Sequence, residues 1–109
     1  MEKFSKYDIE KIEEYWINQK EHKAQLKYLE MSQEKIRLYK NLKSIVESID
    51  NLYATFDEDL KTIVDMRYWY KNHAADFEEI ADKLFMSRSK VLRKRNLLIS
   101  KTAQLIGWI

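Results

Sequence analysis

The sequence predicts an all-α protein. Its 109 residues include no Pro and a single Gly, at position 107, so the usual residues of tight turns between strands are missing over residues 1–106. Hydrophobic residues make up 45% of the chain, which is enough for a core, and many recur at helical spacing. No apolar run reaches the roughly 18 residues of a membrane span. We therefore expect helices only, and no membrane partner.

The composition also excludes several kinds of site. Without Cys the chain has no disulfide, no thiolate zinc site and no cysteine nucleophile, and one Gly is too few for a phosphate-binding loop. His22 and His73 have no paired ligand at metal-binding spacing, and Glu13 and Glu14 are expected on a helix surface rather than in a catalytic cleft. We expect no enzyme activity, cofactor or metal. The first six residues lack the apolar stretch of a signal peptide, so we expect a cytoplasmic protein.

Residues 6–30 are expected to form the first helix, with Ser5 available as its cap. Ile9, Ile12 and Trp16 share one face, but residues 18–23 are almost wholly polar. An apolar patch at each end and a polar middle are typical of a helix on the surface or against a partner. We therefore expect this helix to lie outside the core.

Residues 34–56 carry a strong helical pattern, after a break near 31–34 where Ser32 is available as a cap. Their apolar face is too wide for a two-stranded seam, which predicts burial against more than one neighbour. We expect residues 1–54 to form two helices, arranged as a hairpin, that associate into a homo-oligomer, with a dimer favoured. The side chains expected at this association surface are Leu38, Tyr39, Leu42, Ile45, Val46, Ile49 and Tyr53.

Residues 55–109 are expected to form a module of three shorter helices. Thr55 and Glu58 match a capping box at the start of the first, and Asn72 suits its left-handed end. Its inner face is expected to hold Leu60, Ile63, Val64, Arg67 and Tyr68. Tyr68 and Trp69 are expected to anchor the junction with the next helix.

The second helix of the module has a similar start, because Asp76 and Glu79 also match a capping box. Phe85 and Met86 then make a very short connection to the last helix, which Ser87 caps and Gly107 ends. Two helices joined by so short a turn predict a helix-turn-helix. Its inward side chains are expected to be Ile80, Ala81, Leu84, Met86, Val91 and Leu98.

The outward face of the last helix is polar and basic. At about 100° per residue, with Val91 pointing inward, this face holds Ser89, Arg93, Asn96 and Ser100, with Lys90 at its flank. Arg and Asn read guanine and adenine, while Lys and Ser suit phosphates. Leu92 and Leu97 fall near the flanks, where their methyl groups meet a neighbouring helix, thymine methyls or a partner. The residues expected to contact DNA are Lys83, Ser87, Arg88, Ser89, Lys90, Arg93, Lys94, Asn96 and Lys101.

The charge distribution points to the same end of the chain. Residues 83–109 carry seven cations and no acidic residue, whereas residues 1–82 carry thirteen cations and eighteen anions. A basic segment on a nearly neutral protein indicates a polyanionic partner. We take double-stranded DNA as that partner, in preference to a membrane surface or an acidic protein.

The run from Phe77 to Val91 resembles the region-4 helix-turn-helix of sigma factors, and residues 60–69 resemble the helix that precedes it there. With a long second helix and the Arg67-Tyr68-Trp69 stretch, the chain is similar to small bacteriophage transcription regulators of the RinA and ArpU type. The resemblance implies DNA binding at a phage or prophage promoter in the cytoplasm of a bacterial host. It also implies DNA contacts at Arg88, Ser89, Lys90 and Arg93.

Three residues depart from that pattern or its expected contacts. Phe85 stands where such turns usually have Gly or Asn, and a positive φ there would strain the backbone. Lys94 stands where an apolar residue usually packs, so its stem is expected along the core. Arg95 points close to the core. Its side chain is expected to pack there or to pair with an acidic neighbour, and so not to contact DNA.

The leading functional hypothesis is a sequence-specific transcription regulator that inserts residues 87–106 in the major groove. One alternative is the DNA-binding small subunit of a phage packaging terminase. Another is a protein that contacts RNA polymerase through its region-4-like fold. A monomer or dimer favours regulation, and a closed ring favours packaging.

Overall fold

The chain forms helices only, in the residues that the structure describes. The computed structural model describes residues 4–30, 36–69 and 75–108, and the prediction of an all-α fold is confirmed because no strand occurs in these ranges. The elements, in order, are α1 (Lys6–Ile17), α2 (Gln19–Glu30), α3 (Ile36–Thr55), α4 (Glu58–Val64), the π-helical turn η1 (Asp65–Trp69), α5 (Phe77–Leu84) and α6 (Arg88–Ile106).

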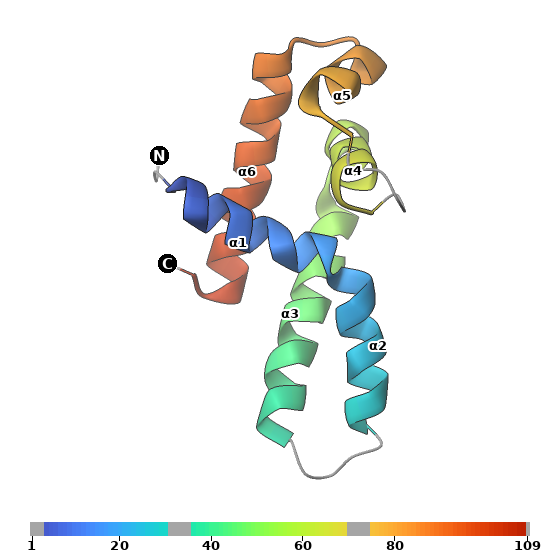
Figure 1. Ribbon diagram of the computed structural model, residues 1–109, viewed down its shortest axis with the longest axis vertical. Coiled ribbons are helices and arrows are strands. Elements are labelled where there is room, and N and C mark those ends of the chain that lie inside the picture. Colours follow the sequence, from blue (N-terminus) through green and yellow to red (C-terminus); the bar gives the residue numbers. More distant parts are fainter. Residues whose placement is uncertain (1–3, 31–35, 70–74, 109) are drawn as a thin grey trace.

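The helices form two groups that share α3 (Figure 1). At one end α2 and α3 lie side by side and extend away from the other helices as a hairpin. At the other end α4, α5 and the first half of α6 pack together, and α1 crosses α6 where the two groups meet. The turn between α5 and α6 therefore lies at the end of the molecule opposite the hairpin.

The first helical stretch differs from the prediction, because it is two helices with a change of direction at Asn18. Ser5 caps α1 as expected: its Oγ accepts from the Asp8 N–H at 3.0 Å, and an Asp8 carboxylate oxygen accepts from the Ser5 N–H at 3.0 Å. The predicted surface location is wrong, since Ile12 and Trp16 are fully buried. The polar residues 18–23 lie where the chain changes direction, between α1, which packs on α6, and α2, which packs on α3.

Trp16 connects four parts of the chain within the main core. Its indole N–H donates to Thr102 Oγ1 of α6 at 3.0 Å. Its ring stacks on Phe56, which follows α3, at 5.7 Å between centroids, and contacts Trp69 of η1 at 5.8 Å. Trp69 in turn donates its indole N–H to the Trp16 carbonyl at 2.9 Å. Residues on both sides of the predicted boundary at 54 and 55 thus contribute to the same core.

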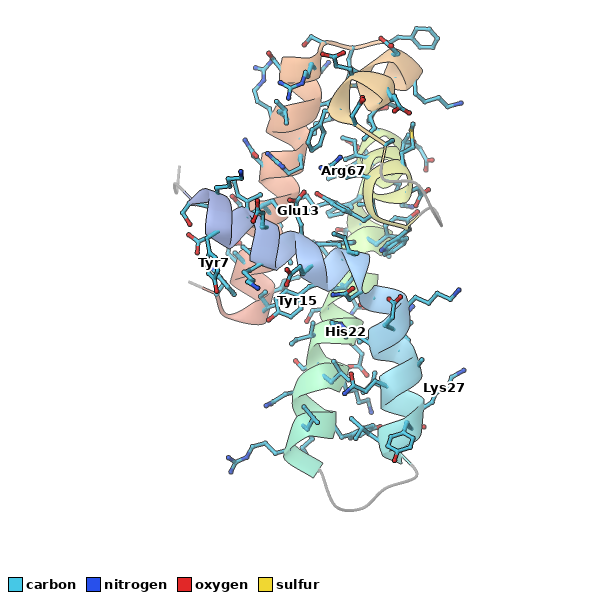
Figure 2. The ribbon with its side chains drawn as sticks, in the orientation of Figure 1. Tyr7, Glu13, Tyr15, His22, Lys27 and Arg67 are labelled. Carbon is cyan, nitrogen blue, oxygen red and sulfur yellow. The ribbon has the colours of Figure 1, made fainter. Side chains whose placement is uncertain are left out.

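The expectation that Glu13 lies on the surface is also wrong. Its side chain is 12% exposed, accepts a short hydrogen bond from the Tyr68 hydroxyl and lies 3.5 Å from the Arg95 guanidinium of α6. Figure 2 shows Glu13 on α1 where this helix crosses α6. Burial raises the pKa of Tyr68 well above its usual range, and the Glu13 charge raises it further. Tyr68 therefore remains protonated and donates to Glu13.

The wide apolar face of α3 packs against several elements, as predicted. Leu42 and Val46 pack against Leu29 of α2 in a small second core, and Ile49 belongs to the main core. The amide of Gln19 fastens α2 to α3 by donating to the Val46 carbonyl at 2.9 Å and to the Asp50 carboxylate at 3.1 Å. Of the side chains expected at an association surface, Leu42, Val46 and Ile49 are buried within the chain, Tyr39, Ile45 and Tyr53 are partly buried, and Leu38 is exposed.

The start of α4 differs from the predicted capping box. Asp57 is the N-cap, and its carboxylate accepts from the Leu60 N–H at 2.8 Å. Thr55 is instead the last residue of α3, where its hydroxyl donates to the Leu52 carbonyl at 2.7 Å. The predicted break at 31–34 with Ser32, and the predicted helix end at Asn72, lie outside the described residues.

The neighbours Glu13 and Glu14 allow a test of the buried ion pair. Glu13→Ala leaves the Arg95 charge without its partner, so we expect a loss of about 3 kcal/mol in unfolding free energy. Glu14 is exposed and, among the described residues, pairs only with Lys11, at 3.6 Å, so Glu14→Ala should cost less than about 0.5 kcal/mol. Urea denaturation followed by circular dichroism measures both. Equal losses for the two variants would contradict a stabilising role for the buried pair.

Candidate nucleic-acid interface

The predicted helix-turn-helix segment has the expected helix ends. Asp76 caps α5 by accepting from the Glu79 N–H at 2.8 Å, and Ser87 caps α6 by accepting from the Lys90 N–H at 3.1 Å. Gly107 ends α6 in the left-handed conformation, with φ of 76°. These three predictions are confirmed. Ser87 and Gly107 fix both ends of α6, the helix that carries most of the expected DNA contacts.

The turn between α5 and α6 is formed by the backbone conformation of Phe85 and by a backbone hydrogen bond of Met86. Phe85 has φ of 55° and ψ of 44°, so the positive φ expected at this position is present. The Met86 N–H donates to the Ala81 carbonyl at 3.1 Å, which closes the end of α5. Ile80, Ala81, Val91 and Leu98 are buried between the helices as predicted, while Leu84 and Met86 are partly buried.

Five of the cations at this end of the chain face solvent. They are exposed and form no ion pair with any described residue: Lys83, Arg88, Lys90, Arg93 and Lys101. Ser87 and Ser89 are exposed beside them. Seven of the nine residues expected to contact DNA are therefore accessible, at the end of α5, at the cap and on α6.

Lys94, the eighth, is directed toward α4. Its ammonium lies 3.5 Å from the Asp57 carboxylate, and its side chain is only 24% exposed. The pKa of Asp57 lies below its usual range, chiefly because the carboxylate accepts from the Leu60 N–H, and the Lys94 charge lowers it further. Lys94 thus joins the start of α4 to α6.

Asn96, the ninth, is partly buried beside Arg95. The Asn96 side-chain oxygen accepts from Arg95 Nε at 3.0 Å, so one of the two groups with which Asn reads adenine is already bonded. Arg95 itself has the acidic neighbour that was expected, Glu13, and lies over the Phe77 ring at 5.1 Å from its centroid. These contacts hold Arg95 and Asn96 against α1 and α5.

The outward face of α6 is rotated relative to the prediction. Arg93 and Ser89 are exposed as expected, but Ser100 is partly buried like Asn96, whereas Leu97 is 50% exposed and Lys101 is exposed. For Asn96 the physical reason is α1, which packs on α6 and pairs its Glu13 with Arg95, and Arg95 in turn donates to the Asn96 side-chain oxygen. Sequence periodicity along α6 carries no signal of this crossing helix.

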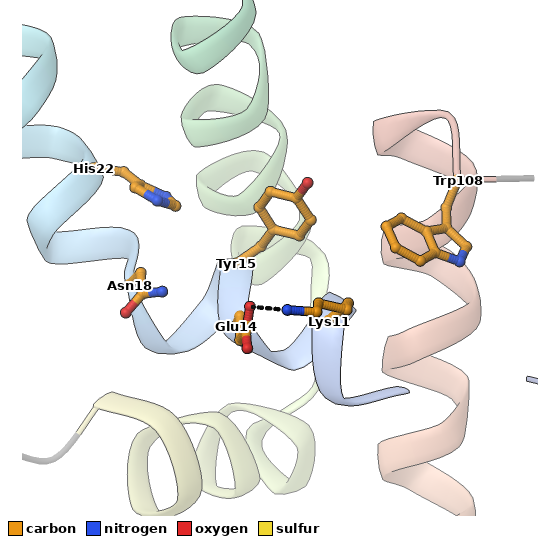
Figure 3. Close-up of a pocket in the computed structure, with 6 residues that line it drawn as sticks. All are labelled: Lys11, Glu14, Tyr15, Asn18, His22 and Trp108. Atoms are coloured by element: carbon orange, nitrogen blue, oxygen red, sulfur yellow. Dashed lines mark ion pairs between the residues drawn. The ribbon is translucent and has the colours of Figure 1, made fainter. Parts of the chain in front are cut away.

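A separate pocket lies where α1 turns into α2, near the end of the chain (Figure 3). It is lined by Lys11, Glu14, Tyr15, Asn18, His22 and Trp108. His22 Nδ1 is buried with no hydrogen-bond partner among the described residues. No group of three or more His, Asp or Glu side chains in those residues is arranged to hold a metal ion. Within the same residues, every helix is too short or too polar to cross a bilayer.

Comparison of this chain with protein-family models, with curated proteins and with solved structures found no match in any of the three.

The Asp57–Lys94 pair makes the stability of the protein depend on pH. Asp57→Asn keeps the cap but removes the charge, whereas Asp57→Ala removes both and should cost about 1 kcal/mol at pH 7. A carboxylate whose folded-state pKa is lowered stabilises the fold above its unfolded pKa, and this contribution is lost as pH falls through the folded pKa. We therefore expect the unmodified protein to be more stable than Asp57→Asn at pH 7. The difference should shrink as pH falls through the unfolded pKa of about 4 and vanish only below the lower folded-state pKa of Asp57.

Urea unfolding of these variants at several pH values measures the effect. Glu47→Gln is a matched control, since Glu47 is an exposed carboxylate that caps no helix and lies 3.9 Å from Lys43. A difference between the unmodified protein and Asp57→Asn that is independent of pH would contradict the role of the charge.

Proposed function

We propose that this chain is a sequence-specific DNA-binding protein that inserts the first half of α6 into the major groove. One observation carries the proposal. Arg88 and Lys90 occupy the first turn of α6, no acidic residue accompanies them there, and both are exposed without an ion-pair partner among the described residues.

This arrangement is unfavourable in the free protein. The amino end of a helix carries a partial positive charge, which favours Asp or Glu and repels cations. The other helix of the pair, α5, follows that rule with Glu78 and Glu79 in its first turn. At the start of α6 the repulsion between like charges is relieved when a phosphate approaches, because the anion interacts with both the helix end and the cations.

The side chains on this surface suit different parts of DNA. Arg93 lies one and a half turns into α6 and offers the paired donors that recognise guanine. Ser87, Arg88, Ser89 and Lys90 lie nearer the start of the helix, where contacts to phosphates fix its position. Lys83 and Lys101 extend the basic surface on either side.

Regulation of transcription, as in small phage regulators, is supported by the resemblance of residues 60–91 to a sigma-factor region and by this basic surface. The oligomeric state discriminates this function from DNA packaging: light scattering should give a monomer or dimer. A closed ring would favour the packaging subunit.

Protein contact is a second candidate function, favoured by a different observation. Leu97 and Leu105 are 50% and 52% exposed on α6, after Arg93 and on either side of Lys101 in the sequence. RNA polymerase is the partner that the region-4 resemblance suggests for such a surface. Failure of the pure protein to bind any DNA would favour this function over the first.

Arg93 is expected to be the main base-reading residue. A specific site is first selected from a random pool of DNA duplexes, and binding is then measured by fluorescence anisotropy. Arg93→Ala should weaken binding to the selected site by about 1–3 kcal/mol and binding to random DNA by less. Arg88→Ala is the control, since loss of a phosphate contact weakens both. Equal losses for Arg93→Ala on the two DNAs would contradict base reading.

DNA affinity is expected to fall steeply with salt, because bound cations release counterions from the phosphates. With three to four of the exposed cations on phosphates, the slope of log affinity against log salt should be roughly −3 per subunit. Lys90→Ala should reduce the slope by about one. Lys94→Ala is the matched control and should leave it unchanged, because Lys94 is paired with Asp57. A slope near zero would rule out phosphate contact by α6.

A further inference from the structure

Phe85, at the tip of the turn between α5 and α6, combines two unusual properties. Its side chain is 96% exposed, so the ring contributes almost nothing to the core. Its backbone is left-handed, with φ of 55°, and it is the one non-glycine residue with positive φ among the described residues. Gly or Asn adopts this conformation more readily, so Phe is unfavourable here in the free protein.

The surroundings of the ring indicate its partner. Lys83 precedes Phe85 by two residues and Arg88 follows it by three, and both are exposed cations of the surface assigned above to DNA. The turn leads directly into the Ser87 cap and the first turn of α6. When that first turn lies in the major groove, Phe85, three residues before Arg88, lies near the edge of the groove.

The major groove offers one apolar group on its base edges, the C5-methyl of thymine, and Phe is among the side chains that contact it. This methyl projects from the side of the base that is nearer its own strand's backbone, and therefore toward the groove edge. The exposed Phe85 ring lies between Lys83 and Arg88 in the sequence, two cations of the surface assigned above to DNA. It therefore has the position and the chemistry to cover a thymine methyl group.

We propose that Phe85 packs against a thymine methyl group at the edge of the DNA site and thereby adds a sequence preference outside the Arg93 contact. This inference rests on the proposed function, because it requires α6 to enter the major groove. It assigns a role to a side chain that the fold itself does not need.

The experiment compares DNA sites that differ by one methyl group. Sites are selected from a random duplex pool with the full chain, and a thymine is expected at one flank of the selected sequence. Replacing that thymine by deoxyuridine, which pairs identically but lacks the methyl, should weaken binding of the unmodified protein about fourfold.

Phe85→Gly and Phe85→Asn remove the ring while suiting the left-handed backbone. Both should bind the thymine site about fourfold more weakly than the unmodified protein does, and should not discriminate thymine from deoxyuridine. Their urea midpoints should equal or exceed that of the unmodified protein, which shows that the fold is intact. Leu105→Ala is the control: Leu105 is another exposed apolar side chain, at 52%, but lies about 25 Å from the start of α6, so discrimination should be retained.

The possible failures are distinguishable. If the unmodified protein binds DNA specifically but the Phe85 variants keep its affinity and its preference for thymine, the methyl contact is wrong and the ring is left for a protein partner. The same conclusion follows if the selected sites contain no flanking thymine. If the unmodified protein binds no DNA, both this inference and the proposed function are overturned.

Discussion

The burial of Trp16 is the constraint on which the arrangement of the other helices depends. A buried indole N–H needs an acceptor, and Thr102 of α6 provides one at 3.0 Å across a sequence separation of 86 residues. The ring is enclosed by Phe56 and Trp69, so α1, α3, η1 and α6 meet at one side chain. Rotation of α6 about its axis would break this hydrogen bond, and α1 therefore fixes which side of α6 faces outward.

The same packing decides which cations remain available at the basic end. Glu13 of α1 forms an ion pair with Arg95, and Asp57, which caps α4, forms one with Lys94. Each pair joins α6 to a neighbouring helix and removes one charge from the outward face. The accessible cations are consequently fewer than residues 83–109 contain. Association through the hairpin would leave this surface free, since the two lie at opposite ends of the molecule (Figure 1).

Features with a local cause could be predicted from the sequence. The ends of α5 and α6 depend on Asp76, Ser87 and Gly107, whose partners lie within four residues. Thr55 was expected to cap α4, but the N-cap is Asp57, two residues further along, and helical periodicity does not locate a helix start to within two residues. The burial of Glu13 was not predictable, because its partners Tyr68 and Arg95 are 55 and 82 residues away. The partial burial of Asn96 has the same origin, since Asn96 accepts from Arg95, which Glu13 of α1 holds from a distant part of the sequence.

The turn between α5 and α6 combines two choices that oppose the stability of the free chain. Phe85 occupies a backbone conformation that suits glycine, and Arg88 and Lys90 stand at a helix end that favours acidic residues. Elsewhere at this end the local rules are followed, as with the acidic first turn of α5 and the glycine that ends α6. Sequences are usually consistent with their structure at each level, and departures concentrate at functional sites. Both departures fit the partner proposed above: a phosphate near the first turn of α6 would relieve the repulsion among its cations, and packing of the Phe85 ring on a thymine methyl would offset the cost of its backbone conformation. This agreement is the strongest physical reason to propose DNA as the partner of this surface.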